Sequence, residues 1–303
     1  MGDIKECRIA TSPAEAVAML KMGPGKGSFV AGGTDICRYS RNFDFLVDIN
    51  HAGLNGIEGS GAGDVLVGAA TTLQECLNDE FLKNFAGGAI CRVAGQHGDR
   101  SVRTSATIGG NICTALPTAD MAPVLMALDA VCIILDEDSQ ESIALADFFV
   151  SPGQTVLNQR LLCGIVLSSD ASQWLCHSFK LSHAAEDTAL VHVAVALEME
   201  ENVITQARIV LGGVGPVPMR SQLAENILKD MNLDQITPEL VENVAMIAAS
   251  ESDPVDDHLA SAEYRMEQVQ VLTRRMLCKV LAEKGMEGCS DADYTSGDDG
   301  GVA

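Results

Sequence analysis

The sequence predicts an α/β domain followed by a smaller α+β domain, because the two halves of this 303-residue chain differ in pattern. In the first half, short apolar runs typical of strands alternate with segments typical of helices, which indicates α/β architecture. In the second half, strand-like runs come first and helical segments follow, which is the α+β order. The length allows two domains with a sizeable core, and we expect them to cover residues 1–170 and 171–285.

The expected elements of the first half start with a helix over 12–22. Ser12 suits its N-cap, Pro13 its first position and Glu15 its first turn. Thr118 is the expected N-cap of a later helix over 119–128. The other expected elements are strands over 28–33, 43–49, 64–73 and 130–136, and a helix over 72–78 that continues from the third of these strands.

The second half predicts a meander of antiparallel strands and then helices. Strands are expected over 161–169, 174–182, 189–199 and 204–215, and helices over 221–230, 238–250 and 261–285. Residues 286–303 are acidic and rich in glycine, which predicts a disordered tail.

The composition limits the classes of function. Twenty basic and 42 acidic residues give a net charge of −22, which repels nucleic acids and anionic membranes. The acidic surface is either merely solvated or suited to a basic partner. No segment is long and uncharged enough to span a bilayer, and the N-terminus lacks a secretory apolar core. The ten cysteines are scattered without a CxxC pair, which favours reduced thiols over disulfides and gives little support to a zinc or iron–sulfur site in this chain. We therefore expect a soluble, cytoplasmic protein.

Two glycine pairs are the most informative motifs. The segment 30–35 reads Val-Ala-Gly-Gly-Thr-Asp, and the segment 107–111 reads Thr-Ile-Gly-Gly-Asn. Adjacent glycines let the backbone turn sharply and approach a ligand closely, and successive amides can form a nest for an anion. One pair alone is more typical of an ordinary tight turn. Two pairs beside hydroxyl or amide side chains could hold a diphosphate without any lysine or arginine.

Other nucleotide and catalytic motifs are missing from the sequence. There is no GxGxxG fingerprint and no GxxxxGK[ST] loop, which disfavours a nicotinamide-binding Rossmann domain and a P-loop ATPase. No histidine accompanies a serine or cysteine nucleophile motif. We therefore predict no catalytic acid, base or nucleophile and no metal ligand in this chain.

The motifs AGGTDI (31–36) and RTSATIGGNICTALPTADMAPVLMALDA (103–130), with SAEYRMEQVQVLTRRML (261–277), resemble the FAD subunits of the molybdenum hydroxylases, such as xanthine dehydrogenase. The resemblance runs to about residue 285. It implies a p-cresol-methylhydroxylase-type FAD-binding domain with two α/β subdomains, followed by an α+β domain with an antiparallel sheet and helices. It also implies a molybdopterin-binding large subunit and a small subunit with two [2Fe–2S] clusters as partners.

The resemblance also assigns cofactor-binding residues. It places His97 near the flavin, Lys180 in contact with FAD and Leu162 against the flavin ring. The residues implied for the two glycine segments are Val30, Ala31, Gly32, Gly33, Thr34 and Asp35 in the first, and Thr107, Gly109, Gly110, Asn111 and Asp120 in the second.

One departure from the family leaves the electron acceptor open. Relatives usually carry one or two arginines shortly after the lysine, whereas this chain has Ala184 and Ala185. NAD+ is the first expectation for the acceptor, and a quinone, ferredoxin or O2 are the alternatives. The substrate of the complex is not encoded here.

Two other functions are alternatives to an FAD-carrying subunit. One is a self-contained flavin oxidase of the vanillyl-alcohol-oxidase type. Three tyrosines, one tryptophan and a compact second half disfavour it. The other is a scaffold that has lost its flavin, which the intact glycine pairs disfavour.

Overall fold

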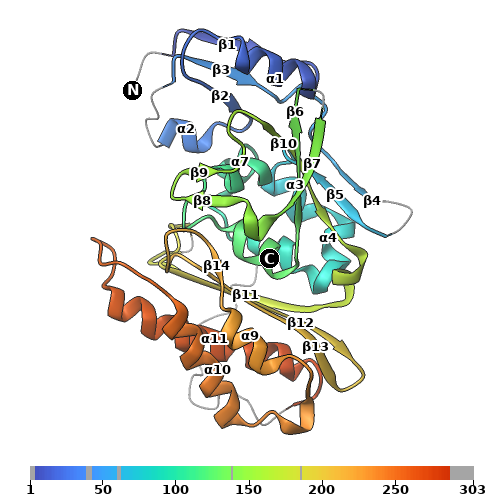
Figure 1. The fold of residues 1–303 in the computed structure, drawn as a ribbon, viewed down its shortest axis with the longest axis vertical. Helices are drawn as coiled ribbons and strands as arrows, with labels where there is room; N and C mark the ends of the chain where they lie inside the picture. Colours follow the sequence, from blue (N-terminus) through green and yellow to red (C-terminus); the bar gives the residue numbers. More distant parts are fainter. Residues whose placement is uncertain (1–3, 39–42, 60–62, 138, 185, 287–303) are drawn as a thin grey trace.

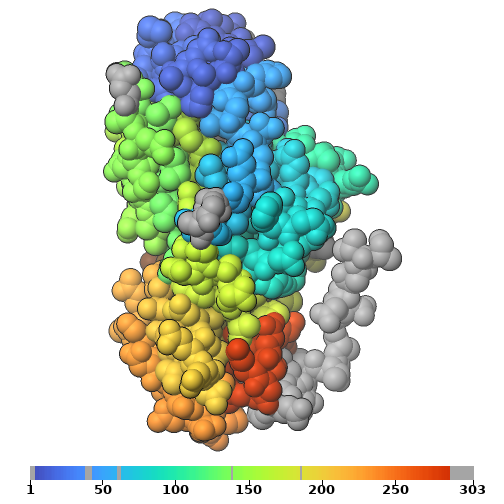
Figure 2. Space-filling model, turned by 90° about the vertical axis from the view of Figure 1, so that its right-hand side faces the viewer, coloured from blue at the N-terminus to red at the C-terminus, as the bar shows by residue number. Residues whose placement is uncertain are grey.

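The computed structural model describes residues 4–38, 43–59, 63–137, 139–184 and 186–286, and its sheets form three layers stacked along the long axis (Figure 1). Figure 2 shows the same order from the side, with the N-terminal layer in blue at the top and the C-terminal layer in orange and red at the bottom. A mixed α/β first part and a second part of antiparallel strands and helices confirm the predicted fold class.

The top layer comprises β1 (Glu6–Ile9), α1 (Pro13–Lys21), β2 (Gly27–Val30), α2 (Thr34–Arg38) and β3 (Phe45–Asp48). Its strands are parallel and lie in the order β1-β3-β2. The start of α1 confirms the predicted cap, because the Ser12 hydroxyl accepts the amide hydrogen of Glu15 at 3.2 Å and Pro13 is the first helical residue.

The middle layer is an antiparallel sheet in the order β4-β5-β10-β6-β7, made of β4 (Ile57–Gly59), β5 (Val65–Gly68), β10 (Leu161–Leu167), β6 (Val131–Asp136) and β7 (Ser139–Ala144). It carries the short helices α3 (Leu73–Asn78), α4 (Glu80–Asn84), α5 (Ala89–Gly95), α6 (Arg100–Arg103), α7 (Ile108–Cys113) and α8 (Met121–Ala127). This part of the chain also contains a hairpin of β8 (Phe149–Ser151) and β9 (Gln154–Thr155). Three 3-10 turns are found there as well: η1 (Phe85–Gly88), η2 (Leu145–Asp147) and η3 (Ser169–Gln173).

Two predictions for this layer are wrong. The run at 161–169 was predicted to open the meander, but β10 lies between β5 and β6. Five of its seven residues are buried, so it is apolar on both faces, and such a run does not reveal its partners. Thr118 is not the N-cap of α8, which begins at Met121. The Met121 amide instead donates to the Asn111 side-chain oxygen at 3.0 Å.

The bottom layer contains the sheet β11 (Leu175–Leu181), β12 (Val191–Glu200), β13 (Val203–Gly212) and β14 (Met219–Arg220), with β15 (Met231–Asn232) beside β13. The helices α9 (Gln222–Leu228), α10 (Pro238–Glu251) and α11 (Ala262–Ala282) follow, with the 3-10 turn η4 (Leu233–Gln235) before α10. Antiparallel pairing of β11, β12 and β13 confirms the rest of the predicted meander.

Strand β12 separates two apolar clusters. Val191, Val193, Val195 and Leu197 belong to the cluster that includes α10 and α11. The alternate residues Ala194 and Ala196 belong to the cluster of the middle layer, as period-two alternation requires. These small side chains let α8 pack closely on the bottom sheet.

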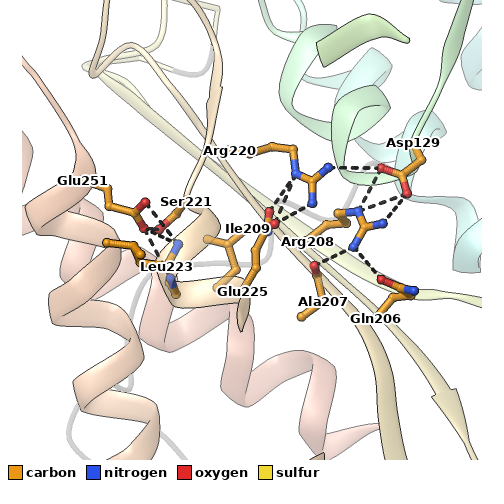
Figure 3. Close-up of polar contacts among 11 residues, drawn as sticks. Asp129, Gln206, Ala207, Arg208, Ile209, Arg220, Ser221, Leu223, Glu225 and Glu251 are labelled. Carbon is orange, nitrogen blue, oxygen red and sulfur yellow. Dashed lines mark hydrogen bonds and ion pairs between the residues drawn. The ribbon is translucent and has the colours of Figure 1, made fainter. Parts of the chain in front are cut away.

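A polar network ties the middle layer to the bottom sheet (Figure 3). Asp129, which follows α8 with a left-handed φ of 49°, receives three hydrogen bonds of 2.7–3.0 Å from Arg208 on β13. Arg220 lies 3.8 Å from the same carboxylate and pairs with Glu225 at 2.5 Å. Glu225 also accepts the Ile209 amide hydrogen at 2.9 Å, so the network extends into the strand.

Glu225→Gln is expected to lower the free energy of unfolding by about 1.5–3 kcal/mol, which is typical of hydrogen bonds to charged groups. Glu225 is buried, and Arg220 would lose its nearest counter-charge. Urea unfolding measures the change, and Glu200→Gln, at an exposed position on β12, is the matched control. Equal losses in both variants would show that the network is not the cause.

The predicted tail lies outside the described residues from residue 287 onward. Among the helices that the structure describes, none has the length and apolar character needed to cross a membrane.

Candidate functional site

Two adjoining cavities, of about 110 and about 570 Å³, lie between the top layer and α7. They lie side by side, because they share the lining residues Ser28, Phe29, Ala31, Thr107, Gly110 and Cys113. Among the described residues that line the smaller cavity there is no lysine and no arginine. The larger cavity has apolar walls that include Leu157, Leu161 and Leu162.

The two glycines of the first pair have different roles, because Gly32 packs against the backbone and Gly33 lies at the cavity. A Cβ on Gly32 would lie 1.8 Å from the carbonyl oxygen of Ser105, so this glycine is required for close backbone packing. Gly33 has a φ of +68°, which favours glycine, and a Cβ there would approach only Val30. Within the described part of the chain, the amides of Gly32, Gly33 and Thr34 donate to no acceptor. These three amides are therefore available to a ligand.

The second glycine pair differs from the first, because it lies in the first turn of α7 and its amides are already used. The Gly109 amide donates to Ala69 O at 2.9 Å, and the Gly110 amide donates to the Thr107 hydroxyl at 3.1 Å. A Cβ on Gly109 would lie 2.6 Å from both Cβ and O of Ala69. The second pair therefore brings α7 against β5 and shapes the cavity. This differs from the prediction that its amides donate to a diphosphate.

Asn111 links the second pair to Asp120. Its side-chain oxygen accepts the Met121 amide hydrogen, so it is engaged with the protein backbone. The turn before Asp120 is held from the bottom sheet as well, because the Gly213 amide donates to Pro117 O at 2.7 Å. These two contacts fix the start of α8 and the side chain that precedes it.

Asp120 is the centre of a buried charge cluster. Its carboxylate lies 2.6 Å from His97 Nδ1 and 3.1 Å from Lys180 Nζ, and both the Asp120 and Lys180 side chains are less than a tenth exposed. Burial by itself would raise the pKa of Asp120, but the hydrogen bond with His97 and the charge of Lys180 outweigh it and lower the pKa below its ordinary value. Asp120 is therefore ionised at neutral pH.

Strands β11, β12 and β13 of the bottom sheet bring Lys180 to Asp120, which lies far from it in the sequence. Lys180 on β11 pairs in register with His192 on β12, and His192 pairs with Gly212 on β13. A Cβ on Gly212 would lie 2.9 Å from Pro123 of α8. This row of the bottom sheet therefore approaches the start of α8 closely enough for Lys180 to reach Asp120.

His192 is fully buried, and neither ring nitrogen has a hydrogen-bond partner among the described residues. Burial lowers its pKa to about 4, so the ring is neutral at pH 7. A histidine within an apolar strand is ordinarily a hydrogen-bonded core residue. His192 is buried in this way, but no hydrogen bond to its ring is found among the described residues.

The structure brings most of the predicted site residues together. Ten line the smaller cavity: Val30, Ala31, Gly32, Gly33, Thr34, Asp35, His97, Thr107, Gly110 and Asn111. Gly109 and Leu162 line the larger one. Asp120 and Lys180 line neither cavity in the structure and connect to the smaller one through the contact of Asp120 with His97.

The sequence missed the loop that follows β9. Asn158 and Gln159 have consecutive left-handed φ values of 47° and 72° and line the larger cavity with Arg160. Strained backbone of this kind gathers at ligand sites. Asn tolerates it, but nothing in the local sequence shows that Gln159 adopts it. Within the described residues, no group of three or more His, Cys, Asp or Glu side chains is arranged to hold a metal ion.

The fold and the cavity define a class of protein with a glycine-lined ligand site between two sheet layers. Residues 4–167 match the family model described as the FAD binding domain in molybdopterin dehydrogenase, and residues 177–280 match the CO dehydrogenase flavoprotein C-terminal domain. The chain belongs to the family of FAD-binding subunits of molybdenum-dependent dehydrogenases, so it is an oxidoreductase subunit and its cofactor is FAD.

Individual relatives support this family assignment. The glyceraldehyde dehydrogenase medium chain of Sulfolobus acidocaldarius is 31% identical over 78% of this chain and 83% of its own length. The xanthine dehydrogenase FAD-binding subunit of Escherichia coli O157:H7 is 26% identical over 94% of this chain and 99% of its own. A solved chain of carbon monoxide dehydrogenase from Hydrogenophaga pseudoflava, lacking the Mo-pyranopterin moiety of its cofactor, has the same fold, with a TM-score of 0.87, 24% identity, and 93% and 99% coverage.

Proposed function

We propose that this chain passes electrons through FAD between a partner subunit and an external acceptor. The observation that carries the proposal is the set of unused amides at Gly32, Gly33 and Thr34, which lie at the smaller cavity, whose described lining residues include no lysine or arginine. Uncharged main-chain donors suit a diphosphate in a protein of net charge −22. The residues present therefore fit the cofactor of the family.

The two cavities suggest which parts of FAD each would hold. We infer that the diphosphate lies against the first glycine pair and the Thr34 hydroxyl. The larger cavity, walled by Leu161 and Leu162, has room for the adenosine end. The isoalloxazine end then lies towards His97 and the Asp120–Lys180 pair, next to the bottom sheet. Leu162 would in this arrangement contact the adenosine end, although the resemblance implied the flavin ring.

Bound FAD supplies a carrier that takes up electrons singly and gives them up as a pair. This chain's residues position it and set its electrostatic surroundings, and none is needed as a nucleophile. We propose a small subunit with two [2Fe–2S] clusters as the electron donor, a molybdopterin-binding large subunit as the site of substrate oxidation, and NAD+ as the acceptor. A quinone, ferredoxin or O2 are the alternatives. The names of the relatives support an assembly, because they describe a medium chain and an FAD-binding subunit.

The domain boundary and the compartment are also proposals. A boundary near residue 170 is supported by the apolar cluster that forms entirely between residues 190 and 281. A cytoplasmic location is supported by the nine described cysteines, all of which are free thiols.

The purified chain is expected to bind FAD and to show flavin absorption at about 450 nm, as any oxidised flavin does. The chain isolated from its source should also bring down companions that contain iron and molybdopterin. A colourless protein after addition of FAD would refute cofactor binding. A yellow single chain that oxidised an organic substrate unaided would favour the self-contained oxidase.

A further inference from the structure

His97 is held rigidly at the edge of the smaller cavity. Its Nδ1 lies 2.6 Å from Asp120 Oδ2, and its side chain is 20% exposed. The Arg103 guanidinium donates to the carbonyls of Gly95 and Gly98, at 3.2 and 2.7 Å, on either side of the histidine. The Lys180 ammonium donates to the carbonyl of the preceding Gln96 at 3.3 Å. The ring is therefore fixed, and its contact with Asp120 leaves Nε2 free to exchange a proton.

The charged groups around His97 come from four elements. Asp120 before α8 is an anion and Lys180 on β11 is a cation, so this pair is neutral as a whole. Arg103 on α6 is engaged with backbone carbonyls, and Asp35 of α2 lines the same cavity. His192 on β12 lies behind Lys180 and is sealed from solvent.

Among these residue types, histidine is the one that ordinarily changes charge between pH 5 and 8. Asp120 stays ionised and Lys180 stays paired through that range. His192 is buried without a hydrogen-bonded route to water among the described residues, and its neutral form is favoured. A proton that binds to His97 therefore adds one positive charge to the cluster at the cavity edge.

We propose that His97 is a redox-linked protonation site, which takes up one proton from solvent at Nε2 when the neighbouring flavin is reduced. The inference rests on the proposed placement of FAD. Bound flavin that has received two electrons from the iron–sulfur donor and one proton would carry one negative charge next to His97. The proton on His97 balances that charge, so two electrons and two protons enter together. When the flavin gives its electron pair up as a hydride, His97 would return its proton to solvent.

In this proposal Asp120 and Lys180 support the protonation of His97. Asp120 accepts from Nδ1 and stabilises the protonated ring, and Lys180 keeps Asp120 ionised. Asp120 and Lys180 are positioning residues in this scheme, and His97 is the group that exchanges the proton.

The test is the midpoint potential of the FAD-loaded full chain, measured by spectroelectrochemistry between pH 6 and 8. One extra proton per two electrons changes the equilibrium tenfold per pH unit, which is 29.6 mV per pH unit for a two-electron couple. Wild-type protein is expected to show a slope steeper by about 30 mV per pH unit than His97→Gln. His183→Gln, which removes an exposed histidine whose Nε2 lies 3.3 Å from Leu259 O, should keep the wild-type slope.

The outcomes separate this inference from the proposed function. Wild-type protein that binds no FAD refutes the proposed function. FAD bound by wild type and His97→Gln with equal slopes overturns the role of His97 and leaves the proposed function intact.

If His97→Gln does not retain FAD, NMR of wild-type protein labelled with ¹⁵N-histidine provides the second measurement. One of the six histidines must then change from neutral to protonated when dithionite reduces the flavin at pH 7. No such change would overturn the inference.

Discussion

Gly33→Val is expected to abolish FAD retention, with a dissociation constant raised more than about 100-fold. A β-branched residue is a strong outlier at the φ of +68° that Gly33 adopts, and the left-handed conformation costs about 1–2 kcal/mol for an L-residue. Relief of that strain would turn the amides of Gly32, Gly33 and Thr34 away from the cavity. The new side chain would also occupy space next to them. Titration with FAD, followed by flavin fluorescence, measures the affinity.

Gly53→Val is the matched control, because Gly53 has a φ of +71°, no atoms near its Cβ position and no part in either cavity. It carries the same backbone strain, so it should lose thermal stability and keep FAD. If both variants lost the cofactor equally, general unfolding would explain the result. Full flavin content in Gly33→Val would show that the amides of the first pair do not hold the diphosphate.

Asp120→Asn is expected to lower the free energy of unfolding by about 3–5 kcal/mol, the usual effect of removing one partner of a buried ion pair. Lys180, whose side chain is 4% exposed, would remain buried without a counter-charge. Urea unfolding at pH 7 measures the loss. Asp129→Asn, at the other end of α8, is the control, and its loss should be near 1 kcal/mol because the Asp129 side chain is 40% exposed. Equal losses at the two ends would contradict the role given to burial.

The pH dependence of this effect has a definite sign. The pKa of Asp120 is lower in the folded protein than its ordinary value of 3.8. The unfolded chain therefore binds the proton more readily, so the stabilisation is fully present above about pH 4 and is lost as the pH falls through the lower folded pKa. Wild-type protein and Asp120→Asn should accordingly converge in stability in strong acid and differ most near neutral pH.

Local sequence patterns predicted much of the fold. The Ser12 cap, the strands β2, β3, β6 and β11–β13, and the three C-terminal helices follow from caps and hydrophobic periodicity, which depend on neighbouring residues. Strand β10 could not be assigned to its sheet, because a run buried on both faces fits any sheet centre. The start of α8 was misplaced, because its first amide is satisfied by Asn111, ten residues earlier.

For the site, too, the sequence shows the local motifs but not the roles that depend on surrounding residues. Both glycine pairs are visible as motifs, and so is the absence of a basic phosphate loop. Their different roles are not visible, because they depend on what lies opposite each Cβ: the Ser105 carbonyl for Gly32, Ala69 for Gly109 and only the Val30 side chain, at 3.6 Å, for Gly33. The left-handed conformation of Gln159 is also imposed by its surroundings.

The amino-acid sequence by itself indicated the family and the cofactor, through the resemblance of its motifs, and it predicted the α/β part followed by the α+β part, because these signals lie in residue types at short spacing. Only the tertiary structure decided the electrostatics of the site. His97, Asp120 and Lys180 are separated by 23 and 60 residues in the chain, and they meet because alternation on β11 and β12 turns one face of the bottom sheet towards α8. Contact between charges that distant in sequence is a property of packing, and no local pattern encodes it.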